Sequence, residues 1–110
     1  MPIPNSEHAF IDIRKLTDYC LNLEHLEGRH KARVFKSALG LDLDNVDKLQ
    51  SALFEAVQTQ PAIPVQQNKY GQKYVVDFIM IHCFQRAMIR SVWIVRHTEG
   101  FPRLVTCYVL

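Results

Sequence analysis

A lysine in an apolar helix face is the first sign of chemistry in the sequence. A helix is expected over roughly residues 30–39, and its apolar side chains fall in one arc: Val34, Phe35, Ala38 and Leu39. Lys31 projects into the middle of this arc and His30 lies on its border. A lysine aimed at apolar surface must carry its ammonium to the rim, find a carboxylate, or occupy a site where it transfers protons or stabilises an anion. Lys31 and His30 are therefore candidate catalytic residues, with a snorkelling Lys31 as the alternative.

An arginine inside an apolar strand is the second sign. Arg90 interrupts a run of apolar residues, and an arginine in the middle of a strand must be paired or line a cleft. The hairpin register expected from a turn at 83–86 places Asp77 opposite Val92 and diagonal to Arg90. Arg90 is thus either the ion-pair partner of Asp77 or a candidate catalytic cation that holds a substrate anion.

The last expected strand carries a guanidinium, a hydroxyl and a phenol close to that arginine: Arg103, Thr106 and Tyr108. We expect Thr106 to join the catalytic group, and Arg103 and Tyr108 to bind substrate. A core position is the alternative for Tyr108, because a tyrosine in a strand is more often packed than exposed to a ligand.

The periodicity of apolar residues predicts the scaffold that positions these side chains. Helical spacing gives way to strand spacing near Pro61, which predicts an α+β fold with two to three N-terminal helices packed on a three- or four-stranded antiparallel sheet. The helices are expected from Asp12 to about Asn22, over roughly 30–39, and from a cap at Asp44 to just before Pro61. Gly40 is expected to end the second helix in a left-handed conformation.

The strands form a meander in this prediction. They are expected at about 70–82, 87–97 and 103–110, with a short strand near 62–66 and hairpin turns at 83–86 and 98–100. One face of the central hairpin is the expected core face: Val76, Phe78, Met80, Ser91, Trp93 and Val95.

Composition narrows the class of protein. The 110 residues suit a single domain, 1–110, with a helical part over 12–60 and the β-meander over 62–110. The formal net charge is only +2, but residues 69–110 hold six basic and two acidic side chains. Three cysteines form no disulfide framework, and no apolar run is long enough to span a bilayer. We therefore expect a cytoplasmic protein with free thiols and no membrane contact.

No motif for a nucleotide, a cofactor or a metal is visible. The sequence has no P-loop, no dinucleotide-binding glycine motif and no histidine pair at a recognised metal spacing. The basic part also lacks clustered carboxylates that could bind Mg²⁺ in a two-metal nuclease. We expect no cofactor and no metal, so any cleavage of RNA here would be metal-independent. That reaction needs a base for the ribose 2′-hydroxyl, cations for the phosphate charge and an acid for the leaving oxygen.

Four segments resemble an uncharacterised bacterial family, a domain of unknown function: Lys-Leu-Thr-Asp-Tyr at 15–19, Gly-Arg-His-Lys-Ala-Arg-Val-Phe at 28–35, Tyr-Gly-Gln-Lys-Tyr at 70–74 and Pro-Arg-Leu-Val-Thr-Cys-Tyr at 102–108. The order of helices and then a four-stranded sheet is similar to the barnase, EndoU, colicin and RelE group of ribonuclease toxins. The resemblance implies a toxin-type ribonuclease, of toxin–antitoxin or polymorphic-toxin kind, that is restrained by a cognate antitoxin or immunity protein. It also implies that Lys31, Arg90 and the strand from Arg103 to Thr106 surround the scissile phosphate.

A non-catalytic interaction module, such as the antitoxin half of a two-protein system, is the alternative. Arg29, Arg33 and Lys36 share one side of the helix over 30–39. Arg33 is a candidate for binding substrate if the protein cleaves RNA, and the three cations form a docking face for an acidic partner if it does not. The sequence leaves the oligomeric state open.

Overall fold

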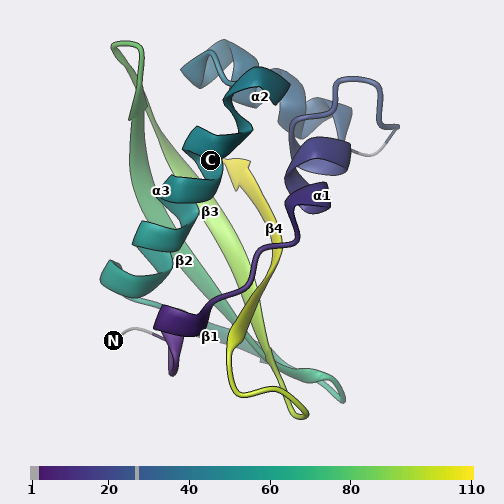
Figure 1. The fold of residues 1–110 in the computed structure, drawn as a ribbon, viewed down its shortest axis with the longest axis vertical. Helices are drawn as coiled ribbons and strands as arrows, with labels where there is room; N and C mark the ends of the chain where they lie inside the picture. Colours follow the sequence, from purple (N-terminus) through teal and green to yellow (C-terminus); the bar gives the residue numbers. More distant parts are fainter. Residues whose placement is uncertain (1–2, 27) are drawn as a thin grey trace.

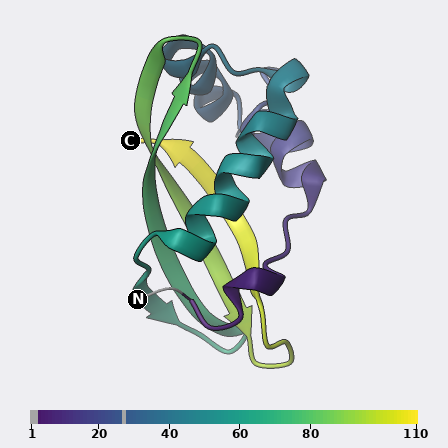
Figure 2. The same ribbon diagram turned by 60° about the vertical axis from the view of Figure 1, so that its left-hand side comes forward.

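The computed structural model describes residues 3–26 and 28–110, and it has the α+β fold expected from the sequence. The helical segments come first: η1 (Ser6–His8), α1 (Ile13–Lys15), η2 (Leu16–Cys20), α2 (Arg29–Leu39), η3 (Leu43–Asn45) and α3 (Val46–Thr59). The strands follow: β1 (Ile63–Gln67), β2 (Gly71–His82), β3 (Gln85–Arg96) and β4 (Pro102–Val109). Figure 1 and Figure 2 show from two directions that the helices gather on one side of the sheet.

The described strands form an antiparallel meander in the order β1-β2-β3-β4, and the short strand expected near 62–66 is β1. The face predicted to form the core does so: Val76, Phe78, Met80, Ser91 and Trp93 are buried, and Val95 packs against them. The apolar stripe of α3 belongs to the same core and consists of Leu49, Leu53, Ala56 and Val57. Helix and sheet therefore enclose one apolar layer. The opposite face of β2 and β3 carries the Asp77–Arg90 ion pair beside exposed apolar side chains such as Ile79 and Met88.

The first helical segment differs from the prediction. Asp12 caps it as expected, because its carboxylate accepts a hydrogen bond from the Arg14 amide at 3.1 Å. The α-helical part ends after one short turn, however, and η2 continues as a π-helical turn in which Leu21 N–H donates to the Leu16 carbonyl. The continuous α-helix to Asn22 is thus wrong. The wider turn directs Leu16, Cys20 and Leu21 into the core together.

The two longer helices begin and end near the predicted positions. Gly40 ends α2 with φ of 66°, and its amide donates to the Lys36 carbonyl at 2.9 Å, as expected for a left-handed terminal glycine. The cap before α3 is shifted: Asp42, rather than Asp44, accepts the capping hydrogen bond, and Asn45 completes a capping box around the turn η3. Because the turn η3 precedes α3, the capping residue lies two positions before the expected one.

The turn between β2 and β3 is shorter than expected. β2 ends at His82 and β3 begins at Gln85, so Cys83 and Phe84 alone make the turn, with φ angles of 49° and 68°. Positive φ at both central residues is typical of a type I′ hairpin turn, which Asn-Gly sequences favour. Neither residue gives that signal in the sequence.

The short turn changes the register of the central hairpin. Asp77 pairs directly with Arg90, whereas a four-residue turn places it opposite Val92. The predicted register is therefore wrong by two residues. Since a shift of two keeps every side chain on its face, the predicted core face was still correct.

The segment before α1 is fastened to the edge of the sheet beside β4. Phe10 donates its amide to the Pro102 carbonyl at 2.9 Å and accepts from the Leu104 amide at 3.0 Å. This parallel bridge brings α1 and η2 alongside β4, as Figure 1 shows. This contact is one of those that hold the N-terminal helical segments against β4.

Candidate functional site

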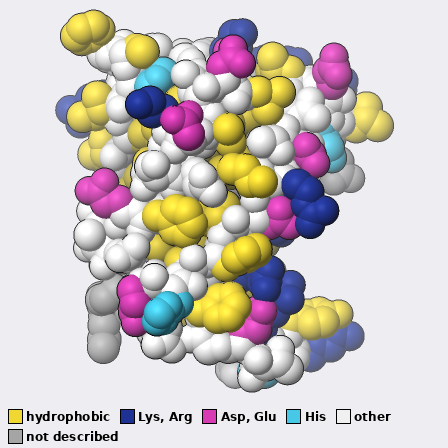
Figure 3. All heavy atoms as spheres, viewed as in Figure 1, with side chains coloured by type: hydrophobic (Ala, Val, Ile, Leu, Met, Phe, Trp, Pro, Cys, Tyr) yellow, Lys and Arg dark blue, Asp and Glu magenta, His cyan; other side chains and the backbone are white. Residues whose placement is uncertain are grey.

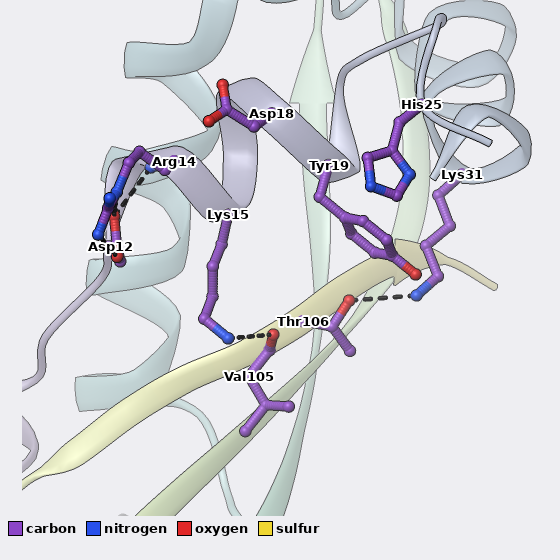
Figure 4. Close-up of a pocket in the computed structure, with 9 residues that line it drawn as sticks. All are labelled: Asp12, Arg14, Lys15, Asp18, Tyr19, His25, Lys31, Val105 and Thr106. Atoms are coloured by element: carbon purple, nitrogen blue, oxygen red, sulfur yellow. Dashed lines mark hydrogen bonds and ion pairs between the residues drawn. The ribbon is translucent and has the colours of Figure 1, made fainter. Parts of the chain in front are cut away.

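Lys31 lies between two tyrosine rings and reaches a threonine hydroxyl. Its Nζ is 4.9 Å from the ring centroid of Tyr19 in η2 and 5.3 Å from that of Tyr108 in β4. The same Nζ donates a hydrogen bond to Thr106 Oγ1 at 3.2 Å (Figure 4). Ring faces stabilise a cation without neutralising it. One of the three ammonium hydrogens serves Thr106, so Lys31 can still donate to an anion.

The start of α2 is fitted closely against η2, which places Lys31 over Tyr19. A side chain at Gly28 would collide with the Tyr19 carbonyl, so glycine is required for this approach. His25 accepts a hydrogen bond from the Gly28 amide through Nδ1 at 2.9 Å, and its ring meets that of Tyr19 edge-on at 4.8 Å. Lys31, in the first turn of α2, is positioned by these contacts.

Lys31 borders two adjoining cavities. The larger has a volume of about 690 Å³ and is lined by residues of α1, η2, α2 and β4: Asp12, Arg14, Lys15, Asp18, Tyr19, His25, Lys31, Val105 and Thr106. The smaller, of about 230 Å³, is lined by His30, Lys31, Val34, Tyr108 and Val109. His30 and Lys31, two of the predicted catalytic residues, therefore line the smaller cavity together with Tyr108.

Charges at the larger cavity are partly neutralised. Arg14 and Asp12 form a two-point ion pair at 2.9 and 3.1 Å, and this arginine holds the pKa of Asp12 below its ordinary value. Lys15 Nζ donates to the Val105 carbonyl on the free edge of β4 at 3.2 Å (Figure 4). Lys15 and Lys31 form no ion pair among the described residues, so the wall along β4 is cationic.

Two buried thiols lie directly behind Thr106. Cys20 Sγ is 3.9 Å from Thr106 Oγ1 and 3.8 Å from Cys107 Sγ, and all three cysteine sulfurs are free thiols. Hydrogen bonding from Cys107, with help from Thr106 and the charge of Lys31, lowers the pKa of Cys20 to about 6 although burial opposes this. The neighbouring Cys20 and burial raise the pKa of Cys107.

Arg90 is occupied by an ion pair. Its guanidinium makes two hydrogen bonds of 2.9 Å with the Asp77 carboxylate. Asp77 raises the pKa of Arg90, and Tyr108, its cross-strand neighbour, adds to that shift. Lys31 and Arg90 therefore both neighbour Tyr108, but the direct partner of Arg90 is Asp77, as one of the two sequence interpretations expected.

The remaining predicted site residues lie apart from Lys31. Arg33 is exposed on α2 and lines neither of the two cavities. Arg103 lines a third cavity and forms a two-point ion pair with Glu99, which raises the pKa of the arginine and lowers that of the carboxylate. The single cleft predicted for Lys31, Arg90 and Arg103 is thus divided among neighbouring surfaces.

Three residues of the site were not singled out from the sequence. Tyr19, His25 and Lys15 come from the segment around η2, where the apolar pattern is short and gives no sign that side chains converge on α2. The only available signal was the family-like string that ends at Tyr19, and it assigns no role.

The described residues form neither a metal-binding cluster nor a membrane-spanning helix. Within residues 3–26 and 28–110, no three His, Cys, Asp or Glu side chains are close enough to hold a metal ion together. The same residues contain no helix that is both long and apolar enough to cross a membrane.

Known proteins share both the fold and the sequence family of this chain. A chain of the "Contact-dependent growth inhibition toxin - immunity protein complex from Klebsiella pneumoniae 342" matches with a TM-score of 0.70 and 15% sequence identity, covering 94% of this chain and 95% of that one. The TM-score shows a shared fold, and at 15% identity the match shows the fold alone. Residues 2–110 match the model of DUF6883, a domain of unknown function, and the chain belongs to that family. No curated protein sequence matches significantly.

Proposed function

We propose that this protein is a metal-independent endoribonuclease of toxin type. The observation that carries the proposal is the Lys31 ammonium, held between two tyrosine rings and a threonine hydroxyl at the border of two cavities. A preorganised cation at a cavity stabilises the charge that develops on a phosphate during cleavage. The related fold in a complex of a growth inhibition toxin with its immunity protein supports a toxin or an immunity-type module, and the Lys31 cluster favours the toxin.

The reaction divides among the residues around Lys31. The ribose 2′-oxygen attacks phosphorus, forming an O–P bond as the bond to the 5′-oxygen breaks. His30 takes the 2′-hydroxyl proton and Lys31 neutralises the charge on the non-bridging oxygens. The Tyr108 phenol, whose ring packs against Lys31, protonates the leaving 5′-oxygen. Thr106 positions Lys31. Arg90, although paired with Asp77, lies beside Tyr108 and orients it, and Arg33 binds substrate on α2 outside the two cavities.

The partners follow from this activity. RNA is the substrate, and a cognate immunity or antitoxin protein restrains the enzyme in the cytoplasm. Such a partner would cover the Lys31 site, because covering it excludes RNA. Binding of that partner and of RNA should therefore be mutually exclusive.

Expression of the protein alone tests the proposal. Induced wild-type protein should arrest growth, and the purified protein should cleave RNA in the presence of EDTA, leaving 2′,3′-cyclic phosphate ends. Lys31→Met should remain folded and lose at least about 10²-fold in cleavage rate, the usual scale for a lost acid, base or charge stabiliser. Lys36→Met is the matched control, because Lys36 is exposed on the same helix away from both cavities. Normal growth together with no RNA cleavage by the wild type would overturn the proposal in favour of an interaction module.

A further inference from the structure

A third cavity, of about 680 Å³, lies beside β4 and is distinctly basic. Five cationic side chains line it, and no acidic one does among the described residues: Lys15, Lys69, Lys73, Arg96 and Arg103. Lys73 pairs across the sheet with Ile94, and Ile94 with Arg103, so these three side chains share the face away from the Trp93 core. In Figure 3, Lys and Arg side chains gather at the lower right, near the two hairpin turns at that end of the sheet.

The loop that carries Lys69 and Tyr70 into this cavity is fixed by hydrogen bonds. The Asn68 side chain accepts from the amides of Tyr70 and Gly71 at 2.8 and 3.2 Å. The His97 amide donates to the Tyr70 carbonyl at 2.9 Å, and the His97 ring lies 3.2 Å from the Asn68 carbonyl. The rim of the cavity is thus built before any ligand arrives, which reduces the entropy cost of binding.

The positive charge of the cavity is only partly balanced. Arg96 and Arg103 share one carboxylate, that of Glu99, at 3.7 Å and 2.6 Å. Lys69 and Lys73 make no ion pair with any residue that the structure describes. Like charges collected in a concave surface create a field that attracts an anion.

The basic cavity adjoins the Lys31 site. Lys15 and Val105 line both this cavity and the 690 Å³ cavity, so the two lie side by side along β4. Tyr70 is 61% exposed at the basic end and offers a ring on which a base can stack. Cations that follow a groove, together with an exposed ring, are typical of binding sites for single-stranded nucleic acid.

We propose that this basic cavity is a non-catalytic subsite that holds the phosphate backbone of a single-stranded RNA next to the position of its scissile phosphate. The choice of RNA as ligand rests on the proposed function, whereas the location of the subsite rests on the cavity itself. Lys69 and Lys73 bind phosphates directly. Arg96 and Arg103, held by Glu99, supply fixed positive charge behind them.

Binding of a short fluorescein-labelled single-stranded RNA, followed by anisotropy over a range of salt concentrations, tests this subsite. The Lys31→Met protein is the background, so that RNA stays intact. In that background Lys69→Gln/Lys73→Gln should weaken binding at least about 10-fold and lower the salt slope by about 1.4, as expected for two lost single-strand phosphate contacts. The matched control, Arg29→Gln/Lys36→Gln, removes equal charge from the exposed side of α2 and should change affinity less than about 2-fold.

Each other outcome has a definite meaning. If both double variants weaken RNA binding equally, the affinity depends on net charge alone and the subsite proposal is overturned. Unchanged RNA binding by Lys69→Gln/Lys73→Gln would overturn it as well. Tighter binding of polyglutamate than of RNA would also overturn it, in favour of an acidic protein partner. If the subsite behaves as expected while the wild-type protein cleaves no RNA, the ribonuclease proposal fails and the subsite stands.

Discussion

The Nζ of Lys31 and the Oγ1 of Thr106 lie 3.2 Å apart although 75 positions separate the two residues in the sequence. This hydrogen bond joins the first turn of α2 to the edge strand β4. Two other contacts fix the same geometry: the bridge from Phe10 to β4, and the close approach of Gly28 to Tyr19. The position of the cation is therefore a property of the tertiary structure, and no single element determines it.

Thr106 is a positioning residue in this scheme, and two substitutions separate its hydroxyl from its shape. Thr106→Val keeps the shape and removes the hydrogen bond, so we expect about a 10-fold or larger loss in RNA cleavage rate with little change in KM. Thr106→Ser keeps the hydroxyl and should restore most of the rate. Cleavage kinetics of both purified variants would check this. Full activity of Thr106→Val together with a loss in Thr106→Ser would contradict this role, because it would show that methyl packing, and not the hydrogen bond, is important.

The sequence predicted the part of the site that depends on local periodicity. Lys31 stood out because it interrupts an apolar helical arc, and the core face of the central hairpin followed from alternation along β2 and β3. The tyrosine environment of Lys31 could not be predicted, because the rings of Tyr19 and Tyr108 both come close to Lys31 only when η2 packs beside β4. Local patterns contain no information on that long-range contact.

The error in register has a similar physical origin. The number of residues in a hairpin turn sets which residues pair, and the turn at Cys83 and Phe84 uses side chains that rarely adopt positive φ. The sequence therefore predicts a longer turn, over 83–86. A longer turn does not place Asp77 directly opposite Arg90. An ion pair between the two residues was nevertheless one of the two roles expected for Arg90, and the structure has it.

The strained turn gives a stability prediction. Replacing Cys83 by Asn and Phe84 by Gly should raise the free energy of unfolding by about 1 kcal/mol, because Asn-Gly adopts the two positive φ angles at low cost. Urea unfolding, followed by the fluorescence of the single tryptophan, measures the change. Cys83→Ser/Phe84→Ala is the control, since it removes the thiol and the aromatic ring and keeps the positive φ at two residues that have a Cβ. A gain of the same size in the control would show that the exposed Phe84 ring, rather than the backbone, was the cause.

The polar group inside the core gives a second stability prediction. Ser91 Oγ donates to the Val76 carbonyl at 2.7 Å and accepts from Trp93 Nε1 at 2.9 Å, and both side chains are fully buried. Ser91→Ala leaves the indole N–H without an acceptor, so we expect a loss of about 1–3 kcal/mol in the free energy of unfolding. Circular dichroism in urea would measure it. Ser51→Ala, at an exposed position of α3, should cost nothing by comparison.

The thiol pair behind Thr106 predicts a dependence of stability on pH. In the folded protein the pKa of Cys20 is lowered from an ordinary value of 9.0 to about 6. Between pH 6 and pH 9 the unfolded chain therefore holds a proton on Cys20 that the folded chain has lost, and stability rises with pH. Because Cys20 is fully buried, the rise can approach about 1 kcal/mol per pH unit. The raised pKa of Cys107 acts in the opposite direction, but its contribution is lost only above pH 9.

Urea unfolding at several values between pH 6 and pH 9, in the presence of a reducing agent, checks this prediction. The wild type should gain stability as the pH rises, and the full contribution of Cys20 is reached near pH 9. Cys20→Ala should be less stable overall, because it leaves a cavity, and its stability should rise much less steeply over the same interval. Cys83→Ser, which removes an exposed thiol, should keep the wild-type slope. If Cys20→Ala and the wild type show the same slope, groups other than Cys20 cause the pH dependence, and the thiolate behind Thr106 does not form.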